Sequence, residues 1–255
     1  MISILRKFRH QRISEDKLIS YFIYALGEIV LVVIGILIAV AINDIQQQKL
    51  LHKKEQAYLI ALKDEFETSK LKLTELIEIN RLNYLSVKKI LEYNSNPKEL
   101  LTEKQFSELL FRSFSFDIAF NANNAVLNEM IYSGSLKDIS NNQLRARLTN
   151  WESRMEDISG QEDELRIQRK QVLDMFRNDK NSIKTILELT TPSSDISYPG
   201  RKKRISNLEL LGSLKFENNI LMFYLTSYST EKSHYNPLMK ELDAILNLIE
   251  AEIKQ

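Results

Sequence analysis

The sequence predicts an all-α protein, with one N-terminal transmembrane helix followed by an elongated antiparallel bundle of three long helices with short helices at its tip. Three observations carry this prediction. Residues 21–42 form one long apolar run. Apolar residues elsewhere recur at helical spacing. The chain of 255 residues has only six Gly and four Pro, which favours long helices over strands and turns.

Composition argues against several classes of function. The 35 Lys and Arg balance 34 Asp and Glu, so no basic field predicts nucleic-acid binding. The absence of Cys excludes disulfides and thiol nucleophiles, and His10, His52 and His234 lie far apart in the sequence. Two Ser-x-x-Lys spacings, at Ser69 and Ser86, lack companion catalytic motifs. We therefore expect no cofactor, no metal and no enzymatic activity.

The apolar run YFIYALGEIVLVVIGILIAVAI, residues 21–42, contains one charged residue, Glu28. At ~1.5 Å per residue it forms a helix of ~33 Å, which matches a hydrocarbon core of ~30 Å. It is longer than the apolar part of a secretory signal, which has about 7–15 residues, and no small-residue cleavage site follows it. The run therefore predicts an uncleaved transmembrane helix.

Basic residues predict the orientation of this helix. Before it lie Arg6, Lys7, Arg9, Arg12 and Lys17, and at a similar distance after it lie only Lys49, Lys53 and Lys54. Because Lys and Arg accumulate on the cytoplasmic side, residues 1–20 are expected to be a basic cytoplasmic tail, and residues 43–255 an extracytoplasmic helical domain. In a bacterium this predicts the inner membrane, with the body in the periplasm.

The next segments read as one long and two short helices. No Pro or Gly interrupts the helical pattern over about 43–93, which ends before Pro97. Thr102 and Gln105 match a capping box, predicting a short helix over about 102–112. A second short helix is expected over about 124–133, ending where Gly134 supplies a left-handed residue. Between them, residues 114–124 alternate enough for a brief extended piece.

Two further long helices are expected, over about 141–189 and 214–254. Asn141 or Asn142 caps the first of them. On the same segment, Glu162, Asp163 and Glu164 are expected to form a solvated face. The last helix has the most regular apolar stripe, made of Leu221, Tyr224, Tyr228, Glu231, Tyr235, Leu238, Leu242, Ile245 and Ile249. Because this spacing continues across Pro237, we expect one kinked helix with its tyrosines in the core.

Long amphipathic helices bury their apolar stripes against one another, which favours an antiparallel bundle. In this packing the first long helix leaves the membrane, the second returns and the third goes out again. The irregular segment between the last two would then lie near the membrane surface. Its basic cluster is predicted to contact anionic lipid headgroups, with a solvated loop as the alternative, and consists of Arg201, Lys202, Lys203 and Arg204.

The transmembrane segment has one face of small residues and a single acid, composed of Ala25, Glu28, Val32, Gly35 and Ala39. An ionisable group costs about 2.5–3.5 kcal/mol near mid-bilayer, and small residues let helices approach closely. This face predicts contact with a second copy or an unidentified membrane protein. Two alternatives are that Glu28 reaches the headgroups, or that it has a proton-coupled role analogous to that of motor stators.

Several stretches resemble an uncharacterised family of single-pass membrane proteins in Bacteroidota. They are LRKFRHQ at 5–11, SYFIYALGEIVLVVIGILIAVAIND at 20–44, VLNEMIYSGSLKDISNNQLRARLTNW at 126–151 and FENNILMF at 216–223. The placement of Gly-Glu inside an apolar run is the more specific feature. The resemblance implies an anchor followed by a helical body, and it implies no catalytic or binding residues.

Together these patterns predict a membrane-anchored helical scaffold or protein-interaction module. The expected partners are the bilayer and either a second copy or an unidentified membrane protein, without nucleic acid. The alternative functions are an extracytoplasmic sensor that binds a ligand between its helices, and a stator-like component that uses Glu28. A pocket with converging charged groups would favour the sensor, whereas a filled bundle would favour the scaffold.

Overall fold

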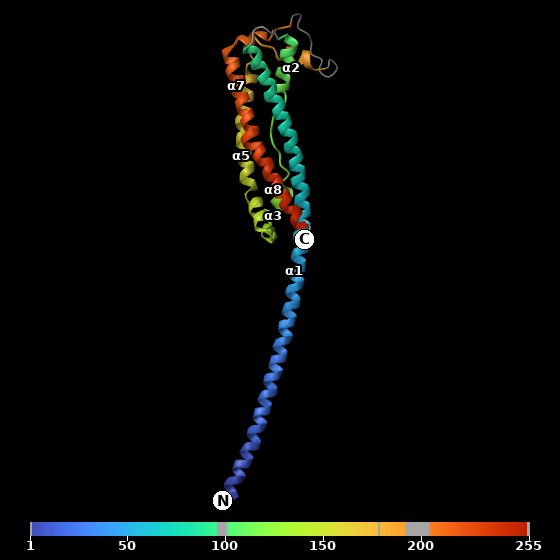
Figure 1. The fold of residues 1–255 in the computed structure, drawn as a ribbon, viewed down its shortest axis with the longest axis vertical. Helices are drawn as coiled ribbons and strands as arrows, with labels where there is room; N and C mark the ends of the chain where they lie inside the picture. Colours follow the sequence, from blue (N-terminus) through green and yellow to red (C-terminus); the bar gives the residue numbers. More distant parts are fainter. Residues whose placement is uncertain (1, 96–100, 178, 192–203, 254–255) are drawn as a thin grey trace. The chain divides into compact units, whose positions relative to one another are not determined.

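The computed structural model describes residues 2–95, 101–177, 179–191 and 204–253, with only the backbone for residues 2–18, 20, 94 and 95. Within these ranges every regular element is a helix and no strand occurs. The chain divides into two compact units, Met1–Gln56 and Ala57–Gln255, called unit 1 and unit 2 below. The first helix, α1, extends from Ile2 to Ser95 and contributes to both units (Figure 1).

Unit 1 is one helical segment whose apolar side chains are exposed. Between residues 21 and 42 the large apolar side chains range from 47 % exposed at Val33 to 81 % at Tyr21. The core helix of a water-soluble domain would bury one face, but none of the most apolar window is buried here. In the described part of the chain, this is the one helix that is long and apolar enough to cross a membrane.

Unit 2 packs its helices around one hydrophobic core, in which Trp151 meets Phe66 edge-on at a centroid distance of 5.0 Å. After the Ala57–Ser95 part of α1, its elements are α2 (Glu103–Phe114), α3 (Ala125–Tyr132), η1 (Ser135–Asp138), α4 (Asn142–Thr149), α5 (Trp151–Asp174), α6 (Ile183–Thr190), η2 (Leu208–Gly212), α7 (Leu214–Ser229), η3 (Thr230–Tyr235) and α8 (Asn236–Ile253). Local residue chemistry explains several helix ends: Thr102 and Gln105 form a capping box at the start of α2, and Gly134, after α3, has φ 70°.

The prediction of a single helix over 141–189 is wrong, because the structure divides this stretch into α4, α5 and α6. Asn150 separates α4 from α5, and its N–H donates to the carbonyls of Ala146 and Leu148. Ser182 starts α6 anew by accepting a hydrogen bond from the N–H of Thr185 at 3.2 Å. Apolar spacing conceals the first break, because Leu148 and Trp151 face the same core on both sides of it.

The two short helices α2 and α3 lie at opposite ends of unit 2, whereas the sequence predicted both at one tip (Figure 1). At the Ala57 end, the hydroxyl of Tyr58 donates to Glu129 of α3 at 3.3 Å. At the Ser95 end, α2 packs against α6. Residues 115–124 are non-helical and connect the two ends, since extended chain covers about 3.3 Å per residue.

This extended connection also reverses the predicted direction of the second long segment. Because residues 115–124 already bring the chain back, α5 begins near the Ala57 end, where Trp151 contacts Phe66. The following segment, α7 to α8, then runs antiparallel to α1. Its order is fixed by two contacts, from Asn80 Nδ2 to the carbonyl of Ser227 at 2.9 Å and from Lys63 Nζ to Glu250 at 3.0 Å.

The chain is helical without interruption from Leu214 to Ile253, but η3 is a π-helix, in which the N–H of Asn236 bonds to the carbonyl of Glu231 five residues back. Such a turn holds one extra residue and shifts the buried face. Upstream, the buried residues are Phe216, Ile220, Phe223 and Ser227. The predicted positions Leu221 and Tyr228 are instead 40 % and 43 % exposed. Downstream, the predicted stripe from Leu238 to Ile249 is buried.

Candidate functional site

In unit 1, the predicted contact face lies on the exposed apolar part of α1. The residues Ala25, Glu28, Gly35 and Ala39 are all exposed there. A Cβ atom added at Gly35 would meet nothing within 4 Å, so this position leaves room for the close approach of another helix. The contact itself stays a prediction.

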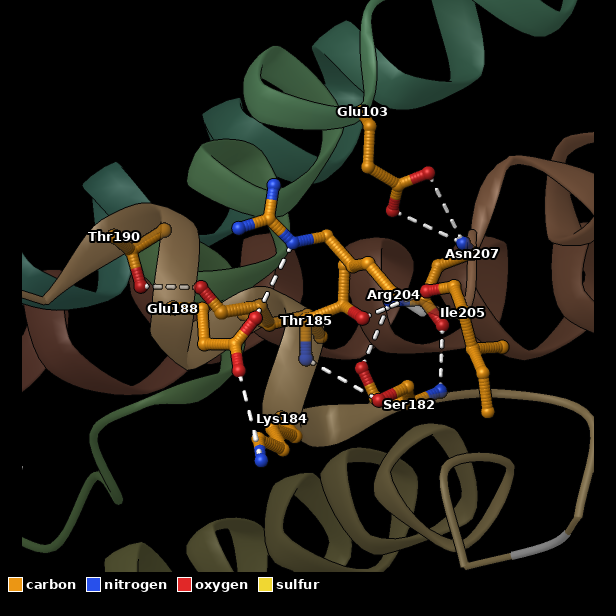
Figure 2. Close-up of polar contacts among 10 residues, drawn as sticks. Glu103, Ser182, Lys184, Thr185, Glu188, Thr190, Arg204, Ile205 and Asn207 are labelled. Atoms are coloured by element: carbon orange, nitrogen blue, oxygen red, sulfur yellow. Dashed lines mark hydrogen bonds and ion pairs between the residues drawn. The ribbon is translucent and has the colours of Figure 1, made fainter. Parts of the chain in front are cut away.

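At the Ser95 end of unit 2, a polar cluster holds residues 204–207 against α2 and α6 (Figure 2). The carboxylate of Glu103 accepts the N–H of Asn207 at 3.0 and 3.1 Å. The side chain of Asn207 accepts from the N–H of Ser182 at 2.7 Å and donates to the Ser182 carbonyl at 2.9 Å. The hydroxyl of Thr185 donates to the carbonyl of Ile205 at 2.7 Å. The donors and acceptors of this cluster bond to one another, which indicates that the cluster has a structural role.

Arg204 belongs to this cluster, whereas Arg201, Lys202 and Lys203 lie outside the described residues. Nε of Arg204 is 3.2 Å from Oε2 of Glu188, which also pairs with Lys184 at 3.7 Å (Figure 2). Within unit 2, this cluster lies at the end of α1 that is roughly 57 Å from Ala57 along the helix. The headgroup contact stays a prediction, and a lipid phosphate would have to compete with Glu188 for Arg204.

Glu231 on the π-helix is a fully buried carboxylate with three donors. It accepts hydrogen bonds from Arg81 at 2.7 and 3.3 Å, from the hydroxyl of Tyr84 at 3.0 Å and from Lys232 at 3.1 Å. Burial opposes ionisation, but the hydrogen bonds from Arg81, Lys232 and Tyr84 outweigh it and lower the pKa of Glu231. The carboxylate is therefore ionised and holds α1 to the π-helix.

Two tyrosines of α7 line the edge of this site rather than the core. The rings of Tyr224 and Tyr228 stack at a centroid distance of 6.2 Å, and both meet Tyr84 edge-on. Nζ of Lys232 lies 5.6 Å from the Tyr228 ring centroid. Of the three tyrosines expected in the core, only Tyr235 is fully buried.

Glu162 is buried, with 4 % of its surface exposed, which overturns its expected place on a solvated face. Oε1 of Glu162 accepts both the hydroxyl of Tyr235 at 2.7 Å and the N–H of Phe120 at 2.8 Å. Burial raises the pKa of the Glu162 carboxyl. Its spacing from buried Ile158 and Leu165 was the sequence signal for this position, because all three fall on one helical face.

Glu65 is a further buried carboxylate that the sequence did not reveal. It accepts the N–H groups of Val126 at 2.7 Å and Leu127 at 3.1 Å, and so caps α3 from another helix. Asn124, the residue in the cap position of α3, instead accepts from the indole N–H of Trp151 at 2.9 Å. This role depends on a contact between distant residues, which local spacing does not encode.

The serines of both Ser-x-x-Lys spacings bond to backbone carbonyls of their own helix. The hydroxyls of Ser69 and Ser86 donate to the carbonyls of Glu65 and Leu82 in their own helix, at 3.0 and 2.8 Å. Lys72 donates to the carbonyl of Asn121 at 3.2 Å. Among the residues that the structure describes, no group of three or more His, Asp or Glu side chains is arranged to hold a metal ion.

A groove of about 580 Å³ lies between α1 and α8 and is lined by Glu67, Lys70, Leu71, Thr74, Asp243, Leu246, Asn247 and Glu250. This volume falls in the range of small-molecule sites, roughly 300–1,000 Å³. Its charged walls pair with each other or with their neighbours: Lys70 is 2.6 Å from Asp243, and Lys63 bridges Glu67 and Glu250. A ligand here would have to compete with these ion pairs.

No protein-family model, curated protein or solved structure matches the chain. The resemblance to an uncharacterised Bacteroidota family therefore stays a prediction.

Proposed function

We propose that this chain is a single-pass protein of a bacterial inner membrane, with residues 1–20 in the cytoplasm and unit 2 in the periplasm as a non-enzymatic interaction module. The supporting observation is the apolar segment at 21–42, whose large apolar side chains are exposed and which is long enough to cross a membrane. Burying a Val, Leu or Ile side chain contributes about 1.5–3 kcal/mol. A bilayer therefore stabilises this segment far more than water does.

The interior of unit 2 supports an interaction role rather than catalysis. Its buried acids at 65, 162 and 231 accept hydrogen bonds from groups of the same chain, so their chemistry is used to hold the helices together. Contacts with a partner are therefore proposed to involve exposed side chains. The face with Glu28 and Gly35 is the proposed contact within the membrane.

A topology reporter tests this proposal. A reporter active only in the periplasm, fused after residue 255, is expected to be active in the full chain and inactive when residues 21–42 are deleted. Activity of a cytoplasm-only reporter at the same position would contradict the proposed orientation. Affinity purification from native membranes, with and without Glu28→Gln, then identifies partners that depend on the membrane face.

The groove between α1 and α8 supports a second candidate, a ligand-sensing module. Its test is a thermal-shift screen of the purified full chain against small molecules, repeated with Asp243→Lys. A compound that raises the melting temperature of the parent but not of the variant would favour the sensor. An equal rise in the melting temperature of both proteins would indicate that the compound binds outside the groove.

A further inference from the structure

Beyond its first turn, which carries Lys215 and Glu217, the solvent-facing side of α7 has no charged residue and presents several large apolar side chains. The chain carries no charged residue between Glu217 and Glu231. The inner face buries Phe216, Ile220 and Phe223. The outer face presents large exposed side chains, with Leu214 at 70 %, Leu221 at 40 %, Leu225 at 50 % and Tyr228 at 43 %. A surface helix ordinarily has a charged or polar outer face, so α7 departs from the expected pattern.

The exposed residues follow a coiled-coil repeat, and we call them the outer seam: Leu214, Asn218, Leu221, Leu225 and Tyr228. Their steps are four, three, four and three residues, which puts Leu214, Leu221 and Tyr228 at d positions and Asn218 and Leu225 at a positions. Asn218 is exposed, like its neighbours in the seam. A single Asn at an a position fixes register and oligomeric state, because it finds its hydrogen-bonding partner in the matching Asn of an in-register helix.

We propose that the outer seam pairs with the outer seam of a second copy of this chain, in parallel and in register. Across a two-fold axis each seam residue lies next to its own copy. A seam that carried Lys or Glu would then place like charges together, whereas an uncharged seam does not. Asn218 would meet the other Asn218, and the Leu residues would pack on either side of it.

The parallel direction rests on the proposed function. Two copies inserted in one bilayer through the same segment are related by a two-fold axis along the membrane normal, and the proposal has the two α7 helices pair along this axis, which gives them the same direction. The seam is short, since 16 residues of α7 span about 24 Å. Its pairing is therefore weak for free molecules and is strengthened when two copies share a membrane, through their effective concentration.

Disulfide trapping of the full chain in native membranes tests this pairing, and the absence of Cys provides a clean background. Asn218→Cys, Leu221→Cys and Leu225→Cys are each expected to form a disulfide-linked dimer on oxidation. Two exposed controls, Ser229→Cys beside the seam on α7 and Glu156→Cys on α5, are expected to give little dimer. Equal trapping at seam and control positions would overturn the proposal.

A second variant tests the seam chemically. Leu221→Lys with Leu225→Lys is expected to abolish trapping at Asn218→Cys, while Glu156→Lys leaves it intact. All three sites are exposed, so folding is preserved, and circular dichroism of the purified chain checks this. Unchanged trapping in the double variant would contradict a seam of Leu contacts.

Fractionation before oxidation separates this inference from the proposed function. Seam-specific trapping in a chain that is recovered as soluble protein would refute the membrane anchor but support the pairing. Trapping at Gly35→Cys without trapping in the seam would overturn the pairing through α7 and leave the membrane contact standing.

Discussion

The hydroxyl of Tyr235 donates a 2.7 Å hydrogen bond to Oε1 of Glu162 and joins η3 to α5 inside unit 2. Four residues before this tyrosine, Glu231 faces Arg81 at 2.7 Å. The π-helix thus links two buried carboxylates whose pKa values move in opposite directions, upward for Glu162 and downward for Glu231. Replacing either acid by Gln should therefore change the pH dependence of stability with opposite sign.

Glu162→Gln should raise the free energy of unfolding at neutral pH. Because the folded pKa of Glu162 is raised, its contribution to stability is fully present below its unfolded value of about 4.5 and is lost as pH rises through the folded pKa. Gln keeps an oxygen for Tyr235 and Phe120 without a buried charge. Urea unfolding measured from acid to neutral pH should show the advantage of the variant growing with pH. An advantage of the variant that shrinks towards neutral pH would contradict a raised pKa of Glu162.

Glu231→Gln should lower the free energy of unfolding at neutral pH by about 1.5–3 kcal/mol, the usual worth of a hydrogen bond to a charged group. Because its folded pKa is lowered, Glu231 contributes stability above the unfolded pKa, and this is lost as pH falls through the folded pKa. The same urea titration should show the deficit of the variant shrinking in acid. The exposed control Glu156→Gln should change little, and a deficit independent of pH would contradict the ion-pair account.

Glu65→Ala should destabilise α3 by about 1–3 kcal/mol, because two buried N–H groups lose their acceptor. The amides of Val126 and Leu127, which donate to Glu65, should lose hydrogen-exchange protection more than those of α7. The Glu65→Gln variant should lose less of this protection, since its side chain keeps one acceptor oxygen. Uniform loss of protection across unit 2 would indicate global destabilisation instead of a missing cap.

Glu28→Gln should weaken disulfide trapping at Gly35→Cys in native membranes, if the face that they share contacts another copy. Trapping at an apolar position on the opposite side of the helix, such as Val30→Cys, serves as the control. Trapping at Gly35→Cys that is unaffected by Glu28→Gln would show that the acid does not support the contact.

Local signals predicted the parts of the fold that local physics determines. The apolar run at 21–42 identifies the candidate membrane helix, and Thr102, Gly134 and Asn141 mark helix ends through their own backbone chemistry. The buried stripe of α1, with Leu59, Leu62 and Phe66, follows from helical periodicity alone.

The remaining features depend on contacts between distant residues. The extra residue of the π-helix moved the buried face of α7 from Leu221 and Tyr228 to Ile220 and Ser227, although the sequence shows an unbroken spacing. Ser182 and Asn207 start a new helix where the pattern seemed to continue. Glu65 accepts a hydrogen bond from the N–H of Val126, later in the chain, and Glu162 accepts one from the N–H of Phe120, earlier in the chain. Both donors are more than forty residues away from the acid. Spacing within one helix contains none of this information.

Alkaline carbonate extraction of cells that express the full chain tests the central claim most directly. The account predicts that the chain stays in the membrane pellet and moves to the supernatant when the exposed apolar residues Val32 and Ile36 are both replaced by Arg, since each charge near mid-bilayer costs about 2.5–3.5 kcal/mol. Complete release of the unaltered chain into the carbonate supernatant would contradict the membrane anchor.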